Sequence, residues 1–178
     1  MTRAPLALLV LAACAVEPAP RLDPASDPAL ARRELLAAAA SGPVPIVVVA
    51  PDGRPTASEA AALAARGITG LSVRFVPVSP PGEGRRLVLA PWGLRDPATA
   101  CTGASRPAPI EEARPLLAAW CDGERVIARI EVPAAAERVE RERAIWRATA
   151  RLFPDPYAET YGFELFGLRI AFGARIGF

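Results

Sequence analysis

The run Ile46-Val47-Val48-Val49 constrains the fold most, because it consists of four adjacent β-branched apolar residues with no polar side. Successive side chains of a β-strand point to opposite faces of the sheet. A strand with this composition is therefore expected to be buried on both faces. We predict such a strand over residues 44–50.

Two helices are predicted on either side of this strand. Before it, Asp27 is an N-cap residue and Pro28 suits the first helical position, so a helix is expected from Pro28 to about residue 40. After it, Thr56 and Glu59 have the spacing of a capping box, in which each side chain accepts a hydrogen bond from the backbone of the other residue. This second helix is expected to end at Gly67.

The longest helix is predicted over residues 134–153. Glu137–Arg141 and Arg138–Glu142 lie at i,i+4 spacing, which is typical of exposed ion pairs worth a few tenths of a kcal/mol each. The apolar residues of this segment predict its buried side, which comprises Val139, Ile145, Trp146, Thr149, Leu152 and Phe153.

A first hairpin is predicted from alternating residues. Apolar and polar residues alternate at Leu71, Val73 and Phe75, as in a strand with one solvent-exposed face. Pro80-Pro81-Gly82 breaks this strand, and residues 87–89 begin another apolar stretch. The pattern favours an antiparallel hairpin between the two strands.

A second hairpin is predicted at Asp122-Gly123, a residue pair typical of a two-residue type I′ turn. Residues 126–132 are expected to form the strand that follows it. The preceding segment, residues 110–121, is ambiguous, because Pro115 either begins a short helix or interrupts one.

Together these elements predict one small α+β domain over residues 28–178. Its sheet is expected to be mixed or antiparallel, with about 4–6 strands, and to be packed by about three helices. Residues 14–27 contain Pro18, Pro20 and Pro24 and are expected to form a proline-rich tether.

The charged residues exclude several kinds of chemistry. All 21 basic residues are arginine, and the chain contains no lysine and no histidine. The absence of histidine excludes Ser-His-Asp and Cys-His catalysis and the usual zinc and haem ligand sets, and the absence of lysine excludes Schiff bases. We expect no cofactor and no metal. The net charge of +2 gives no support for nucleic-acid binding, and the arginine excess fits the codon usage of a G+C-rich genome.

The N-terminus carries a motif that ends in a cysteine. Arg3 precedes a short apolar stretch, and Leu11-Ala12-Ala13-Cys14 follows it. This arrangement resembles the signal peptide and lipobox of bacterial lipoproteins, although a leader of residues 1–13 is short for that class. The resemblance implies cleavage before Cys14 and lipidation of its sulfur. The alternative is an apolar N-terminal helix of a cytosolic protein.

The lipobox resemblance also implies a cellular location. Ala15, and not an aspartate, follows Cys14, which by the same resemblance favours a lipid anchor on the periplasmic face of the outer membrane. An inner-membrane anchor facing the periplasm is the alternative. In that oxidising compartment the two further cysteines, Cys101 and Cys121, are expected to form a disulfide that pins a Pro- and Gly-rich loop. Two buried free thiols are the alternative.

The C-terminal segment, residues 157–178, contains six aromatic residues and four glycines. Its last eleven residues alternate in polarity and end in phenylalanine, which resembles the closing strand of outer-membrane β-barrels. A barrel needs at least eight such strands, and the chain has too few. The apolar residues of this strand are Leu168, Ile170, Phe172, Ala174, Ile176 and Phe178.

Three interpretations of this segment are open. The strand pairs within the domain's own sheet and packs on the long helix, or it docks a partner by strand addition. In the second case the partner is a cell-envelope or outer-membrane protein, and Leu168, Ile170, Phe172, Ile176 and Phe178 are the contact residues. A helix is the third interpretation, because some of these residues also have helical spacing.

The function predicted from sequence is that of a non-catalytic envelope lipoprotein acting through protein–protein contacts. The alternative is an envelope hydrolase or glycan-binding protein that uses carboxylates and Tyr157 or Tyr161. A carboxylate pair about 5–10 Å apart in an arginine-lined cleft would favour that alternative.

Overall fold

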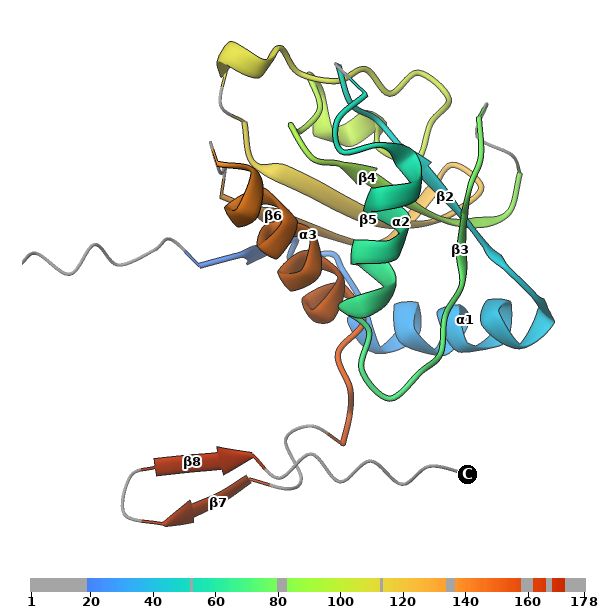
Figure 1. Ribbon diagram of the computed structural model, residues 1–178. Helices are drawn as coiled ribbons and strands as arrows, with labels where there is room; N and C mark the ends of the chain where they lie inside the picture. Colours follow the sequence, from blue (N-terminus) through green and yellow to red (C-terminus); the bar gives the residue numbers. More distant parts are fainter. Residues whose placement is uncertain are drawn as a thin grey trace, which may run out of the picture.

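The structure is a computed structural model (Figure 1). It describes residues 19–51, 53–79, 83–112, 114–133 and 137–157, and the backbone of residues 162–165 and 168–171. Within these residues, three α-helices pack on a six-stranded mixed sheet, so the predicted α+β class is confirmed.

The sheet has the strand order β1-β6-β5-β4-β2-β3. Its strands are β1 (Arg21–Leu22), β2 (Val44–Val48), β3 (Phe75–Pro77), β4 (Arg85–Ala90), β5 (Leu116–Asp122) and β6 (Arg125–Val132). The helices are α1 (Pro28–Ser41), α2 (Ala57–Arg66) and α3 (Arg138–Leu152), and two short 3₁₀ helices span Pro97–Thr99 and Ile110–Glu112. None of the described helices is long and apolar enough to cross a membrane.

The predicted antiparallel hairpin between residues 71–75 and 87–89 is wrong. β3 and β4 do not pair with each other, because β2 lies between them and is parallel to both. The apolar strand β2 takes this inner position because both of its faces need cover. Ile46 belongs to the core beneath the helices, and Val47 packs on the opposite side of the sheet, as the sequence predicted.

The first two helices begin and end close to the predicted residues. The Asp27 carboxylate accepts a hydrogen bond from the backbone N–H of Leu30 at 2.8 Å, which caps α1. In α2 the Thr56 hydroxyl accepts from the N–H of Glu59 at 3.3 Å, and Glu59 accepts from the N–H of Thr56 at 2.9 Å. The capping box is therefore confirmed.

The predicted buried side of α3 is confirmed in part. Ile145, Thr149, Leu152 and Phe153 are buried as predicted, and so are Ala144 and Ala148. The prediction is wrong for Val139 and Trp146, which are 56% and 46% exposed. α3 closely approaches the end of α2 at Gly67. A Cβ added at Gly67 would lie 2.6 Å from the carbonyl oxygen of Trp146, so this position has no room for a side chain.

The two faces of the sheet are covered differently. The three helices form the main core on one face, where Trp120 of β5 packs edge-on against Phe153 with ring centroids 5.5 Å apart. Residues 91–115 cover the other face with a second, smaller cluster that includes Leu94, Cys101 and Cys121. A loop takes the place of a helix layer on this second face.

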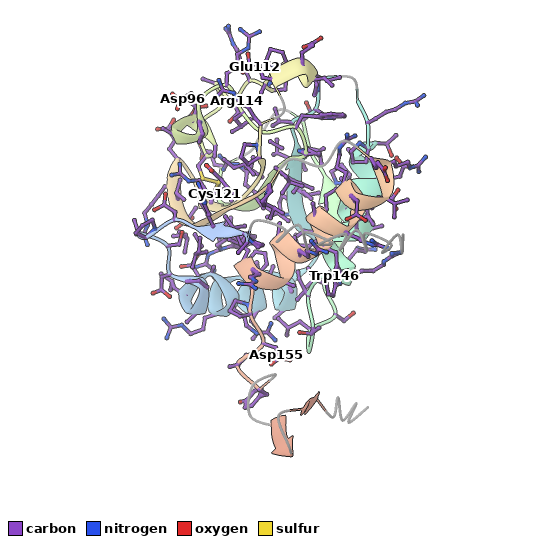
Figure 2. All side chains as sticks on the ribbon, turned by 90° about the vertical axis from the view of Figure 1, so that its left-hand side faces the viewer. Asp96, Glu112, Arg114, Cys121, Trp146 and Asp155 are labelled. Atoms are coloured by element: carbon purple, nitrogen blue, oxygen red, sulfur yellow. A yellow bond between two sulfur atoms is a disulfide. The ribbon has the colours of Figure 1, made fainter. Side chains whose placement is uncertain are left out.

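A disulfide joins this covering loop to the sheet. Cys101 and Cys121 have Cα atoms 5.5 Å apart and are bonded through their sulfurs (Figure 2), which confirms the predicted pair. Both residues are buried. The guanidinium of Arg86, also buried, donates to the carbonyl oxygen of Cys101 at 2.5 Å and fixes the loop at the same point.

Residues that were expected to lie in the tether join the fold. β1 pairs antiparallel with β6, and the N–H of Asp23 donates to the carbonyl oxygen of Arg129 at 3.0 Å. The Arg129 guanidinium forms an ion pair with the Asp23 carboxylate and donates to the carbonyl oxygen of Pro97 at 3.0 Å. The sheet therefore begins at Arg21, before the predicted boundary at residue 28.

The segment that was ambiguous in sequence contains both a short helix and a strand. Ile110–Glu112 is a single 3₁₀ turn, and β5 begins at Leu116, directly after Pro115. β5 and β6 form the second predicted hairpin. Its turn residues are Gly123 and Glu124, one position later than expected, since Asp122 pairs with Arg125.

Residues 162–165 and 168–171 of the C-terminal segment form a separate pair of strands. β7 (Gly162–Leu165) pairs antiparallel with β8 (Leu168–Ala171) in its own two-stranded sheet, set apart from the domain (Figure 1). Residues 168–171 are thus neither helical nor paired with the six-stranded sheet. Two of the three interpretations are therefore wrong for these residues.

Candidate functional site: a pocket lined by arginines and a tryptophan

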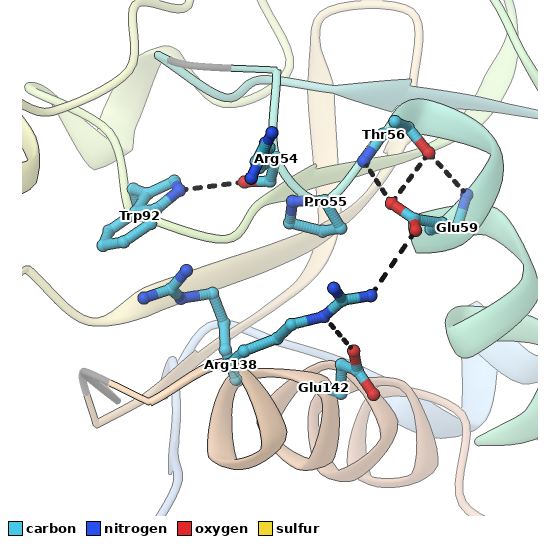
Figure 3. A pocket seen from close by; sticks show the side chains of 8 residues that line it. Arg54, Pro55, Thr56, Glu59, Trp92, Arg138 and Glu142 are labelled. Carbon is cyan, nitrogen blue, oxygen red and sulfur yellow. Dashed lines mark hydrogen bonds and ion pairs between the residues drawn. The ribbon is translucent and has the colours of Figure 1, made fainter.

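A pocket of about 560 Å³ opens where the first turns of α2 and α3 meet two loops. This volume is in the range of pockets that hold small ligands. The pocket is lined by Arg54, Pro55, Thr56, Glu59, Trp92, Arg138, Arg141 and Glu142. Three segments that are distant in sequence contribute to it, namely residues 54–59, Trp92 and residues 138–142, and Figure 3 shows their side chains converging on one space.

Two carboxylates at one end of the pocket share a single arginine. Nε of Arg138 lies 2.9 Å from Oε1 of Glu142, and its Nη2 lies 3.6 Å from Oε1 of Glu59. Because Arg138 and Glu142 belong to α3 and Glu59 belongs to α2, this network ties the two helices together (Figure 3).

Glu59 is held in its ionised form. The backbone N–H of Thr56 donates to its carboxylate, the Thr56 hydroxyl donates as well, and these hydrogen bonds lower the pKa of Glu59. The positive charges of Arg138 and Arg54 act in the same direction. The pKa of Arg138 is raised, chiefly by its hydrogen bond to Glu142.

Trp92 forms the other end of the pocket. Its indole N–H donates to the carbonyl oxygen of Arg54 at 3.0 Å, which fixes the orientation of the ring. Cζ of Arg141 lies 3.3 Å from the centroid of that ring, in a cation–π contact. Figure 3 shows Trp92 across the pocket from Glu59.

The residues that line the pocket are mostly charged. Three arginines face two glutamates, which leaves one net positive charge. A general acid in a glycosidase needs a carboxyl group with a raised pKa, whereas the pKa of Glu59 is lowered. Within the described ranges, no group of three or more His, Cys, Asp and Glu residues could hold a metal ion.

The site residues predicted from sequence lie elsewhere or outside the described residues. The Cys101–Cys121 disulfide belongs to the loop-covered face of the sheet, and neither cysteine lines the pocket. Tyr157 is 68% exposed and does not line the pocket either. Cys14 and Tyr161 lie outside the described residues.

The predicted partner-binding residues are only partly described. Leu168 and Ile170 lie in β8, opposite Leu165 and Phe163 of β7, so the four residues occupy one face of the hairpin. Phe172, Ile176 and Phe178 lie outside the described residues.

Sequence analysis did not identify the pocket. Its arginines could not be distinguished from the other arginines of an arginine-rich chain. The residue that could have indicated the pocket from sequence is Trp92, a large aromatic residue between Pro91 and Gly93 in a loop with few other apolar side chains. A tryptophan in such a place is often part of a binding surface.

Comparison of the chain with known protein families, with curated proteins and with solved structures found no match.

Proposed function

We propose that this protein is a lipid-anchored protein of the cell envelope whose domain acts by binding. The observation that carries the proposal is the Cys101–Cys121 disulfide. The chain has three cysteines, so this pairing leaves Cys14 as the remaining one, at the end of the lipobox-like run. Structural disulfides persist in oxidising compartments such as the periplasm, where lipoproteins of this kind reside.

The position of β1 is compatible with such an anchor. The sheet begins at Arg21, only seven residues after Cys14. A fully extended chain of that length reaches at most about 25 Å. The proposal therefore places the domain close to the membrane surface, on the periplasmic face of the outer membrane.

Binding is favoured over hydrolysis by the residues of the pocket. Glu59 and Glu142 are two carboxylates in an arginine-lined cleft, the arrangement that would suit a hydrolase. Both, however, are engaged by the same arginine, and Glu59 also caps α2. One of these ion pairs joins α2 to α3 and the other lies within α3, so both carboxylates have structural roles, and a pocket of this kind is suited to recognition.

The experiment is metabolic labelling with radioactive palmitate in a bacterial host that expresses the full chain. We expect label on the wild-type protein and its recovery with the membranes. Cys14→Ser should lose the label and move to the soluble fraction. The control is Cys101→Ala/Cys121→Ala, which keeps Cys14 and should retain the label per molecule of protein. Two results would contradict the anchor. One is palmitate label on the Cys14→Ser protein, and the other is recovery of the unlabelled Cys14→Ser protein with the membranes.

A further inference from the structure

We propose that residues 172–178 bind along the free edge of β3, where their apolar side chains fill a groove beside α2. This segment adds one strand to the six-stranded sheet of its own chain. The inference concerns a surface other than the pocket at Trp92, and it depends neither on that pocket nor on the lipid anchor.

β3 is an edge strand that has backbone groups to offer. Its neighbour in the sheet is β2, and the register places Phe75 opposite Val44. The N–H of Val44 donates to the carbonyl oxygen of Arg74 at 2.9 Å. Because alternate residues of a strand bond to the same neighbour, Phe75 and Pro77 direct their backbone groups away from β2. Among the described residues no strand lies beyond β3 to pair with these groups (Figure 1).

A groove of about 320 Å³ lies beside this edge, between α2 and β3. α2 contributes Ser58 and three alanines to its lining, and the strand side contributes Val73, Phe75 and Pro77. Arg74 is the one charged residue that lines it. Small residues on α2 leave space for large side chains from another segment. A strand added at the edge of β3 would place every second side chain in this groove.

The sequence of residues 172–178 has the pattern of such a strand. Apolar residues occupy every second position, and glycine or arginine occupies the positions between them. The apolar set comprises Phe172, Ala174, Ile176 and Phe178. When this set faces the groove, the other set lies on the opposite side of the sheet, where Val76 of β3 is 40% exposed. The segment therefore supplies apolar side chains to the groove and polar or small ones to the other side.

The chain leaves the domain close to the segment that leads into β3. A Cβ added at Gly70 would lie 2.8 Å from Oδ2 of Asp155, so the chain after α3 passes directly beside Gly70. Phe75 follows Gly70 by five residues, a span of at most about 17 Å. The edge of β3 is therefore near the point of exit.

The pairing of β7 with β8 keeps residues 172–178 within reach of that edge. Gly162 pairs with Ala171, so the chain that follows β8 returns to the start of β7. Gly162 follows Tyr157 by five residues, again at most about 17 Å of extended chain. A short connection of this kind gives the segment a high effective concentration at the groove of its own chain. An edge covered in this way is also protected from pairing with other proteins.

Hydrogen exchange of the Phe75 amide, measured by NMR, tests the proposal. The full chain is compared with a chain that ends at Ala171, and Cys14→Ser is present in both so that neither carries lipid. We expect the Phe75 amide to exchange at least about a hundredfold faster in the shorter chain, because it loses its hydrogen-bond partner. The amide of Val88 in the inner strand β4 is the internal control and should be unchanged.

Single replacements test the groove in the full chain. Ile176→Asn places a polar group in the groove and should expose the Phe75 amide as the deletion does, whereas Arg175→Asn creates the same residue on the other side and should keep it protected. Ala62→Trp fills the groove from α2 and should also release the segment. Its control is Ala37→Trp, at an exposed position of α1.

Analytical ultracentrifugation distinguishes the chain's own segment from that of a second copy. We expect a monomer in which the Phe75 amide is protected at every concentration. Protection that is lost on dilution, together with dissociation of a dimer, would assign the edge to a second copy and overturn the proposal.

Two further results would overturn it. One is equal exchange of the Phe75 amide in the full chain and in the chain that ends at Ala171. The other is a Phe75 amide that responds in the same way to Ile176→Asn and to Arg175→Asn, because the groove would then not select the apolar set. None of these results affects the palmitate labelling of Cys14, so the two proposals fail independently.

Discussion

Arg32 of α1 donates a hydrogen bond to the carbonyl oxygen of Phe153 at 2.9 Å and so joins the first helix of the domain to the end of the last one. The guanidinium also donates to the carbonyl oxygen of Thr69 at 2.9 Å and lies 3.8 Å from the Asp155 carboxylate. Arg32 is only 8% exposed. The buried side chain of Arg32 therefore connects α1 to the loop at Thr69 and to residues 153–155, where the chain leaves the domain towards β7.

Replacement of Arg32 should destabilise the whole domain. Arg32→Ala leaves two carbonyl oxygens and a partly buried carboxylate without this partner, and we expect a loss of about 3 kcal/mol in the free energy of unfolding. Arg32→Lys should recover only part of this loss, because an ammonium group cannot reproduce the guanidinium fork. Urea denaturation measures both. The neighbouring exposed residue gives the control, since Arg33→Ala should change stability by less than about 0.5 kcal/mol. An Arg32→Ala protein as stable as Arg33→Ala would contradict this role.

The close approach of α2 and α3 is tested by Gly67→Ala. The new Cβ would lie 2.0 Å from the Thr149 hydroxyl oxygen and 2.6 Å from the carbonyl oxygen of Trp146, so the helices must move apart. We expect a loss of about 2–3 kcal/mol in stability by thermal or urea unfolding. Gly103→Ala is the control, because nothing lies within 4 Å of the added atom there. Equal stability of the two variants would show that the helices do not pack in this way.

The disulfide should contribute strongly to stability, because it closes a loop of some twenty residues over the second cluster. On the chain-entropy account, removal of such a cross-link costs roughly 3 kcal/mol. The free energy of unfolding of Cys101→Ala/Cys121→Ala in urea should be lower by about that amount. Reductant should destabilise the wild-type protein and leave the double variant unchanged. A wild-type protein that is insensitive to reductant in its unfolding transition, with two free thiols on denaturation, would contradict the bond.

Acid should destabilise the fold through two carboxylates. The backbone N–H of Ala25 and the charge of Arg129 lower the pKa of Asp23, and hydrogen bonds from Thr56 lower the pKa of Glu59. A carboxyl group whose pKa is lowered by folding stabilises the protein above its ordinary pKa, and that contribution is lost as the pH falls. The free energy of unfolding should therefore decrease between about pH 5 and pH 3.

Amide variants separate these contributions. Asp23→Asn and Glu59→Gln cannot be protonated in this range, so each should make the dependence of stability on pH shallower than in the wild-type protein. Urea unfolding at a series of pH values measures the slopes. If both variants kept the wild-type slope, the acid sensitivity would come from other groups.

The parts of the fold that depend on neighbouring residues could be predicted from the sequence. Asp27, Pro28 and the capping box of Thr56 with Glu59 act within one helical turn, and the helices begin where these residues indicate. The apolar run in β2 correctly predicted that both faces of the strand are covered, although Val47 on the loop-covered face is only half-buried. The cysteine pair was predictable because its partners were the two cysteines outside the N-terminal motif.

The parts that depend on distant residues could not be predicted in the same way. Sequence proximity suggested that β3 and β4 pair, whereas both pair with β2. The prediction for α3 was wrong at Val139 and Trp146, because the positions of apolar residues along a helix do not show which of them meet another element. The pocket is built from three segments that are distant in sequence, and no local pattern among the arginines marks the ones that line it.

Mass spectrometry of the N-terminal peptide, from protein purified out of membranes, tests the central claim most directly. The account predicts a chain that begins at Cys14 and carries the mass of a diacylglycerol on its sulfur. A chain that retains Met1 and has an unmodified thiol at Cys14 would contradict it.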